Sequence, residues 1–347
     1  MAYRGYNPLN KHLLLVGAGH AHLETIINVK RFLEKGIRVT VLSPSPYQYY
    51  SGMGPGLLQG FYPAEAVRFD MKNMAESRGA VFLEGTAARV EPEKRLVHLA
   101  SGDEIAYDAV SFSIGSEIDT GPIEILGDNI YTVKPIESLS SARQAINNAL
   151  LERNVEVVVV GGGAAGVEIA ANASQIGREA PFRARISLIT RGKLLRRFPA
   201  AVRRKASRKL LNLGVSVLED TAIEGSAAKN IVTSQKKNIP YNFMLVASGT
   251  RPPSLFSGSN LPTGETGGLL VNRFLQSTGF PDIFGGGDWE YTCKTLRDVP
   301  SIYGGTCGSQ ADEGMVDFGL KYLGEDRMIF GTDVNFETGV GKVLSAN

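Results

Sequence analysis

Glycines recur at two places in this sequence, each time between an apolar run and a segment of helical character. The first segment is Gly17-Ala18-Gly19-His20-Ala21-His22, which follows residues 13–16, and the second is 161–166, which follows 157–160. A strand, a tight turn and a helix in this order bring backbone N–H groups at the helix N-terminus close to a pyrophosphate. The spacing therefore predicts two dinucleotide sites in one chain.

The two glycine segments differ at one position. The second is a complete G-x-G-x-x-G, and residues 186–189 supply the next strand at the expected distance. The first has His22 where the third glycine is expected, so its helix must stand slightly away from its strand. Two histidines with one residue between them do not share a helix face, so we expect no metal site at His20 and His22.

Length and composition exclude several classes of protein. The 347 residues suit two domains, or one domain with a large insertion, and 43% hydrophobic content is ordinary for a globular protein. Only two cysteines, Cys293 and Cys307, argue against a disulfide-stapled secreted protein and favour the cytoplasm. No apolar run reaches the roughly 18 residues of a membrane-spanning helix, so we expect at most a peripheral contact with the inner face of the membrane.

The remaining sequence alternates strand-like and helix-like segments, which is typical of an α/β fold. Residues 117–135 hold two prolines and two glycines among polar residues and are interpreted as a linker. A helix is expected after each glycine turn, the first running to about residue 34, and another at about 137–152. The expected strands are 38–42, 81–83, 87–90, 95–99, 104–105, 107–115, 157–160, 186–189 and 241–250. The order predicts two Rossmann-like domains, each a parallel sheet with helices and a β-meander.

An aromatic and glycine-rich segment, Tyr47-Gln48-Tyr49-Tyr50-Ser51-Gly52-Met53-Gly54-Pro55-Gly56, follows the second expected strand. Pro44 and Pro46 precede it and force an extended loop. The segment is either a surface loop with a few anchoring rings or a stretch whose backbone lies against a flat ligand. We favour the second interpretation, because the glycine turn supplies a ligand.

Four features occur here in the order and spacing of one family: the two glycine turns, Ala247-Ser248-Gly249 and Gly287-Asp288. Residues 12–320 thereby resemble the two-dinucleotide-domain flavoproteins, the pyridine nucleotide–disulfide oxidoreductase superfamily. The resemblance implies FAD at the first turn, NADH or NADPH at the second, and a Gly-Asp segment that closes on the flavin's ribityl chain. Because residues 43–70 contain no cysteine, the chain is similar to the thiol-independent branch, the type II NADH dehydrogenases, and to the flavoprotein domain fused to selenophosphate synthetase.

The resemblance also assigns domains and site residues. It implies a discontinuous FAD-binding domain at 1–118 and 251–325, an inserted NAD(P)H-binding domain at 119–250, and a short C-terminal extension at 326–347. Glu168 is expected as a catalytic residue where nicotinamide meets flavin, although a carboxylate in a first helical turn also suits the helix dipole. The expected cofactor-binding residues are Gly17, Gly19, His20, Ala21, Ser43, Ser51, Gly52, Met53, Ala87, Ser113, Gly115, Gly161, Gly163, Gly166, Arg191, Gly249, Gly287 and Asp288.

Both positions expected to contact an adenosine ribose lack the usual acid. Ser43 ends the second strand of the first domain, and its hydroxyl can bind a ribose more weakly than a carboxylate would. Thr190-Arg191 occupies the equivalent position of the second domain. Arg191 could pair with a 2′-phosphate, so we hypothesise a preference for NADPH.

A basic run continues from Arg191. Residues 191–209 include nine basic residues and no acid, with Leu195, Phe198, Val202, Leu210 and Leu211 interleaved as an apolar face. The pattern suits a solvated helix that covers its own sheet, and the alternatives are a contact with anionic lipid or a phosphate clamp. Nucleic acid is not an expected partner, because no recognition motif accompanies the charge.

The resemblance implies an FAD-dependent oxidoreductase that accepts hydride from NAD(P)H and passes electrons to a non-thiol acceptor such as a quinone. Gln310 falls roughly where quinone-reducing relatives place a glutamine. One alternative is a sulfide:quinone-reductase-like enzyme using Cys293 and Cys307, which also suit buried small residues; the other is a flavin-binding electron-transfer or regulatory subunit. Residues 321–347 are too few for a large interface domain, so we expect an acceptor on an open flavin, or a partner protein or second copy that completes the site.

Overall fold

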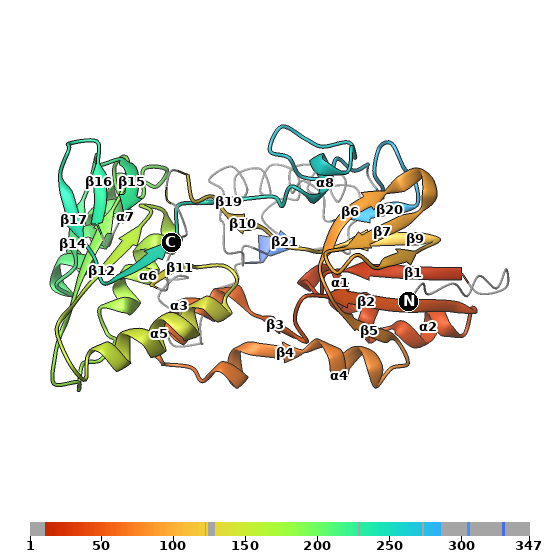
Figure 1. The fold of residues 1–347 in the computed structure, drawn as a ribbon, viewed down its shortest axis with the longest axis horizontal. Coiled ribbons are helices and arrows are strands. Elements are labelled where there is room, and N and C mark those ends of the chain that lie inside the picture. Colours follow the sequence, from red (N-terminus) through yellow and green to blue (C-terminus); the bar gives the residue numbers. More distant parts are fainter. Residues whose placement is uncertain are drawn as a thin grey trace.

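Two lobes, each built on a five-stranded parallel sheet, make up the described part of the chain (Figure 1). The structure is a computed structural model that describes residues 11–121, 123, 129–227, 230–272, 274–285, 304–305 and 328–329. The first sheet has the order β20-β9-β1-β2-β5. Its strands are β1 (Lys11–Val16), β2 (Ile37–Ser43), β5 (Val81–Glu84), β9 (Ala109–Phe112) and β20 (Ile283–Gly285).

The second sheet repeats this arrangement with the order β11-β18-β12-β13-β14. Its strands are β11 (Ile130–Thr132), β12 (Val155–Val160), β13 (Ala184–Ile189), β14 (Ser216–Leu218) and β18 (Phe243–Val246). In both sheets the strand before the glycine turn lies in the centre, since β1 pairs with β2 and β9 and β12 pairs with β13 and β18. The predicted α/β fold with two Rossmann-like sheets is confirmed.

Smaller sheets accompany the two large ones, and all are antiparallel except the parallel pair β21 and β22. Each lobe has a three-stranded meander, formed by β6 (Ala87–Glu91), β7 (Leu96–Leu99) and β8 (Glu104–Ala106) or by β15 (Ile223–Ala227), β16 (Asn230–Thr233) and β17 (Asn238–Pro240). The short pairs are β3 (Tyr47–Tyr49) with β4 (Arg68–Asp70), β10 (Glu117–Ile118) with β19 (Thr250–Arg251), and β21 (Gly304–Gly305) with β22 (Met328–Ile329). The first two of these pairs lie between the lobes (Figure 1).

Helices connect the strands in both lobes. The α-helices are α1 (His20–Ile27), α2 (Val29–Leu33), α3 (Gly54–Gln59), α4 (Met71–Glu76), α5 (Glu137–Ala149), α6 (Ala164–Ala173), α7 (Ala200–Asn212) and α8 (Leu255–Gly258). The 3₁₀ turns are η1 (Ser51–Met53), η2 (Ala64–Val67) and η3 (Pro92–Lys94). The central strands form because their apolar runs are buried on both faces, as the near-zero exposure of Leu14 and Val159 shows.

Helix α3 belongs to the first half of the sequence but packs on the second lobe. Leu58 is fully buried in the hydrophobic cluster that contains the strands of the second sheet. Gly54 approaches α5 so closely that a Cβ there would lie 3.1 Å from Leu139 Cδ1. The chain therefore crosses to the second lobe and returns before the first sheet is complete.

Three expectations about the elements are corrected. The linker predicted at 117–135 contains β10 and β11, and β11 pairs with β18 as an edge strand of the second sheet. The aromatic segment 47–56, for which a surface loop was one interpretation, contains β3, η1 and the start of α3. The predicted first helix is interrupted at Asn28, whose side-chain amide donates to Glu24 O and Oε1.

Candidate functional site

The first glycine turn is fixed between the ends of three strands. Gly17 has φ +86°, and its N–H donates to Leu42 O at 2.7 Å. A Cβ on Gly17 would lie 2.2 Å from Ser113 O, so no other residue fits without moving the backbone. Gly19 N donates to the same Ser113 carbonyl at 3.2 Å. The turn is therefore held rigidly where α1 begins, and the N–H groups of that helix point outward.

A cavity of about 950 Å³ opens beside this turn. It gathers side chains and backbone from the carboxyl ends of β1, β2 and β9, from β3, and from the segments that join the lobes. Nine of the expected cofactor-binding residues line it, and these are Gly17, Gly19, His20, Ala21, Ser43, Ser51, Ala87, Ser113 and Gly115. Residues that are far apart in the sequence thus line one continuous cavity.

Other expected residues lie elsewhere. Gly52 and Met53 follow Ser51 in η1 and do not line the cavity. Gly287 and Asp288, like Cys293, Cys307 and Gln310, lie outside the described residues. Sequence reasoning missed the contribution of 132–137, because the residues up to 135 are interpreted as a linker and the approach of the segment to the cavity depends on how the two lobes pack.

The cavity fits an extended dinucleotide such as FAD. Its volume is at the upper end of the range of about 300–1,000 Å³ usual for ligand sites. The turn leaves the first residues of α1 free of acidic side chains, which a phosphate requires. Ser43 presents a hydroxyl at the end of β2, where a ribose would lie in a Rossmann fold.

His22 takes the place of the third glycine in a specific way. The imidazole is 2% exposed, with Nδ1 2.6 Å from Gly17 O and Nε2 2.9 Å from Ser111 Oγ. Because a carbonyl oxygen can only accept a hydrogen bond, Nδ1 donates to Gly17 O. In the neutral ring Nε2 is then an acceptor, and the Ser111 hydroxyl donates to it. Burial lowers the pKa of His22, which keeps the ring neutral and suited to both hydrogen bonds.

His20 lies at the mouth of the cavity among aromatic side chains. Its ring contacts Tyr50 edge-on, with centroids 5.6 Å apart, and Phe69 at 6.5 Å. Nearby, the Arg68 guanidinium lies 3.9 Å above the ring of Tyr47, and Tyr47 itself lines the cavity. The expectation that the aromatic segment lies against a ligand therefore agrees with its place on the cavity wall.

The second glycine turn has the tighter geometry. Gly161 has φ +128°, and a Cβ on it would lie 2.1 Å from Ala247 O. A Cβ on Gly166 would lie 1.8 Å from Gly161 O, so the third glycine lets α6 pack directly against the turn. A Cβ on Gly163, in contrast, would meet nothing within 4 Å. The backbone of Gly163 is therefore open for a phosphate to approach.

The other expected residues of the second lobe surround this turn and not the large cavity. Glu168 is exposed on α6, Arg191 is exposed just after β13, and Gly249 follows β18 with φ +121°. None of the three lines the cavity beside Gly17. The assignment of Glu168 to the meeting point of two cofactors stays a prediction.

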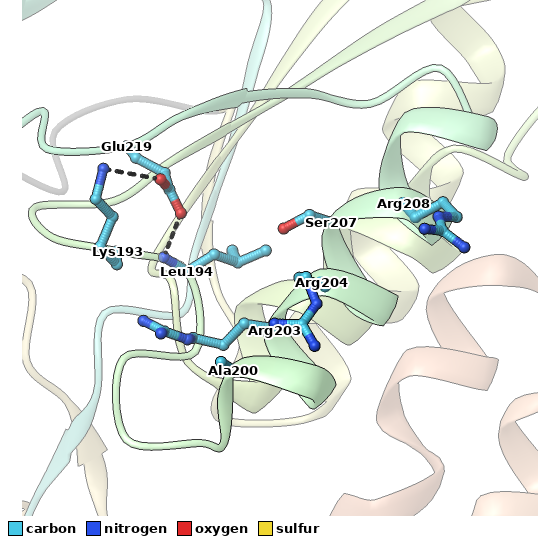
Figure 2. Close-up of a pocket in the computed structure, with 8 residues that line it drawn as sticks. All are labelled: Lys193, Leu194, Ala200, Arg203, Arg204, Ser207, Arg208 and Glu219. Carbon is cyan, nitrogen blue, oxygen red and sulfur yellow. Dashed lines mark hydrogen bonds and ion pairs between the residues drawn. The ribbon is translucent and has the colours of Figure 1, made fainter.

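A second, smaller cavity of about 530 Å³ in the second lobe is lined by four basic side chains, Lys193, Arg203, Arg204 and Arg208 (Figure 2). Lys193 and Leu194 line it, and the next residue, Leu195, donates its N–H to Gly162 O at 2.7 Å. Lys193 pairs with Asp220 and Glu219, which raise its pKa. The three arginines that line the cavity, Arg203, Arg204 and Arg208, have no ion-pair partner among the described carboxylates.

The apolar face expected on the basic helix is only partly present. Leu195 and Leu210 are buried, but Val202 is 41% and Leu211 73% exposed. The apolar face that α7 buries against its sheet is therefore narrower than the sequence indicated. Within the ranges that the structure describes, none of the helices combines the length and apolar character that crossing a membrane requires.

Comparison with known proteins agrees with this geometry. The chain is similar to demethylphylloquinone reductase NdbB of Synechocystis sp., with 27% identity over 226 residues, which is 62% of this chain and 55% of that protein. It is also similar to a probable NADH dehydrogenase of Dictyostelium discoideum, with 21% identity over 310 residues, 80% of this chain and 67% of that one. The chain thus spans between about half and two-thirds of the length of such relatives.

Solved structures share the fold. NDH2 from Plasmodium falciparum in complex with NADH superimposes with a TM-score of 0.66 at 20% identity, covering 80% of this chain and 64% of that one. The family model of the pyridine nucleotide-disulphide oxidoreductases matches residues 11–301. The resemblance inferred from the glycine turns is therefore confirmed, and the chain belongs to the pyridine nucleotide-disulphide oxidoreductase family.

Proposed function

We propose that this chain is an FAD-dependent oxidoreductase that accepts a hydride from NADH or NADPH and passes the electrons to a non-thiol acceptor. The observation that carries the proposal is the pair of glycine turns at the carboxyl edges of two parallel sheets, with a dinucleotide-sized cavity beside the first. Ligands of doubly wound folds bind at this edge.

In this reaction the residues of the chain bind and orient the two nucleotides. FAD, when bound, supplies the hydride acceptance and the electron release that side chains cannot perform. The N–H groups at the start of α1 hold the pyrophosphate, and Ser43 holds a ribose hydroxyl. The open backbone at Gly163 holds the phosphates of the second nucleotide. Gly287 and Asp288 stay candidates for the ribityl chain.

A quinone is the acceptor that the relatives favour. The Synechocystis relative is named for the reduction of a quinone. Residues 43–70 contain no cysteine, which does not favour a dithiol acceptor. Because quinones dissolve in membranes, the proposal includes a peripheral contact with a membrane surface.

Anaerobic spectroscopy tests the proposal. The purified protein should show the visible absorption of a bound flavin, NADH or NADPH should bleach it, and a water-soluble ubiquinone analogue should restore it. Absence of flavin, or a flavin that neither nucleotide bleaches, would overturn the proposal. Bleaching by sulfide alone would instead favour the sulfide-oxidising alternative, and bleaching by no donor would favour an electron-transfer subunit.

Coenzyme preference is a separate part of the proposal. Arg191 at the end of β13 and the unpaired arginines of α7 make this side of the second turn positive, which favours the 2′-phosphate of NADPH. We expect Arg191→Glu to lower the ratio of kcat/KM for NADPH to that for NADH by about tenfold or more. Arg185→Glu is the matched control, because Arg185 lies at the start of β13 and pairs with Glu156. A wild-type protein that strongly prefers NADH would contradict this part.

A further inference from the structure

Lys134 brings a positive charge into the large cavity from the second lobe. It follows β11, and its Nζ donates to Ser116 Oγ at 2.8 Å. Ser116 follows β9 of the first lobe, and both residues line the cavity that begins at Gly17. The contact therefore places the ammonium group where the two lobes meet, inside the space that we assign to FAD.

No described carboxylate neutralises this ammonium group. Lys134 has no Asp or Glu oxygen within 4.0 Å among the residues that the structure describes. Burial is the single cause of the lowered pKa of Lys134, with no charged neighbour contributing to the shift. Glu117 also lines the cavity, but its carboxylate faces Arg251 at 3.9 Å.

The backbone of Lys134 is fixed as well. Thr132 Oγ1 donates to Lys134 O at 2.6 Å, so the start of the side chain is held on the cavity wall. Lys134 is also the single lysine or arginine among the described residues that line this cavity. Keeping an unbalanced charge in a partly dehydrated place costs free energy, and such groups are concentrated at functional sites.

We propose that Lys134 raises the reduction potential of the flavin by compensating the negative charge that arrives with the hydride. This inference rests on the proposed function. A hydride leaves NAD(P)H as two electrons and one proton, and NAD(P)⁺ remains, so a neutral acceptor gains one unit of negative charge. A fixed cation in a low-dielectric cavity stabilises that charged product more than the neutral reactant.

The test is the midpoint potential of the bound flavin, measured by equilibration with a reference dye. Lys134→Met removes the charge with little change in length, Lys134→Arg keeps the charge, and Ser116→Ala keeps the charge but removes the hydrogen-bond acceptor. We expect Lys134→Met to shift the oxidised-to-reduced ratio at least about tenfold towards oxidised flavin, which is a potential lower by about 30 mV for two electrons. Lys134→Arg should stay close to the wild-type potential, and Ser116→Ala should shift it less than Lys134→Met.

Three results would overturn the inference. The first is an unchanged potential in Lys134→Met, and the second is an equal shift in Ser116→Ala, which would assign the effect to the hydrogen bond. The third is loss of flavin from both Lys134→Met and Lys134→Gln while Lys134→Arg retains it, which would assign the charge to binding the oxidised cofactor. Absence of flavin from the wild-type protein is a different failure, because it removes the proposed function itself.

Discussion

His22 performs with a side chain what glycine performs in the second turn. At Gly166 the absence of a Cβ lets α6 contact the Gly161 carbonyl directly. In the first turn the imidazole of His22 hydrogen-bonds both Gly17 O and Ser111 Oγ. His22 is buried and does not line the large cavity, so we expect its role to be structural.

Replacing His22 with glycine should lower stability without losing the flavin. The variant leaves a buried cavity and two polar groups without partners, which we expect to cost about 2–4 kcal/mol in the free energy of unfolding. Urea unfolding of the flavin-free protein measures this loss, and the visible spectrum measures flavin retention. Normal stability with loss of flavin would show that the imidazole itself belongs to the ligand site.

Buried histidines should also make the fold sensitive to acid. Burial is the largest cause that lowers the pKa of His12 and of His22. Their protons are therefore bound more strongly in the unfolded chain, so stability is complete above the unfolded value near 6.5 and declines as pH falls towards the lower native values. Urea unfolding between about pH 7.5 and about pH 5 should show this decline, and His12→Gln or His22→Gln should reduce its slope. If both variants kept the wild-type dependence of the free energy of unfolding on pH, the assignment to these histidines would be contradicted.

Two alanine substitutions at the second glycine turn, at Gly166 and at Gly163, separate the packing of α6 from the binding of a nucleotide. An alanine at Gly166 would place its Cβ against a backbone carbonyl, so we expect Gly166→Ala to destabilise the second lobe by about 1–3 kcal/mol. An alanine at Gly163 meets open space and should leave stability unchanged, but it should weaken NAD(P)H binding about tenfold, because the methyl group occupies the phosphate approach. Equilibrium unfolding and nucleotide titration of the flavin distinguish the two effects. Equal effects of both substitutions on stability would contradict this account.

The sequence predicted the elements whose structure is determined by adjacent residues. It did not predict the elements that form only by pairing with residues far away in the sequence. The glycine turns and the central strands are encoded by adjacent residues, so nine residues that line the large cavity could be named from the sequence, and their role in binding a cofactor stays a prediction. Strand β11 has three residues and is a strand only because β18 offers it an edge, so a linker was the natural prediction. The position of Lys134 follows from β11 and was missed for the same reason.

The two lobes are connected by the packing of side chains as well as by the polypeptide backbone. Leu58 of α3 is fully buried in the core of the second lobe, although α3 follows the first β–α–β unit in sequence. We expect Leu58→Ala to lower the free energy of unfolding by about 2–5 kcal/mol, because the cavity it leaves is in a close-packed cluster. Thermal or urea unfolding measures this, with Leu151→Ala as control, since Leu151 is 65% exposed. A loss in the control as large as that in Leu58→Ala would contradict the role of α3.

The strand order of the two sheets has a consequence for synthesis of the chain. All five strands of the second sheet come from residues 130–246, whereas the first sheet needs β20, which ends at Gly285. As the chain leaves the ribosome, the second lobe has all its strands while the first still lacks an edge. Domains generally fold as units, usually the N-terminal one first. Here the middle of the chain finishes first, and the N-terminal strands wait with an open edge until residues 283–285 emerge.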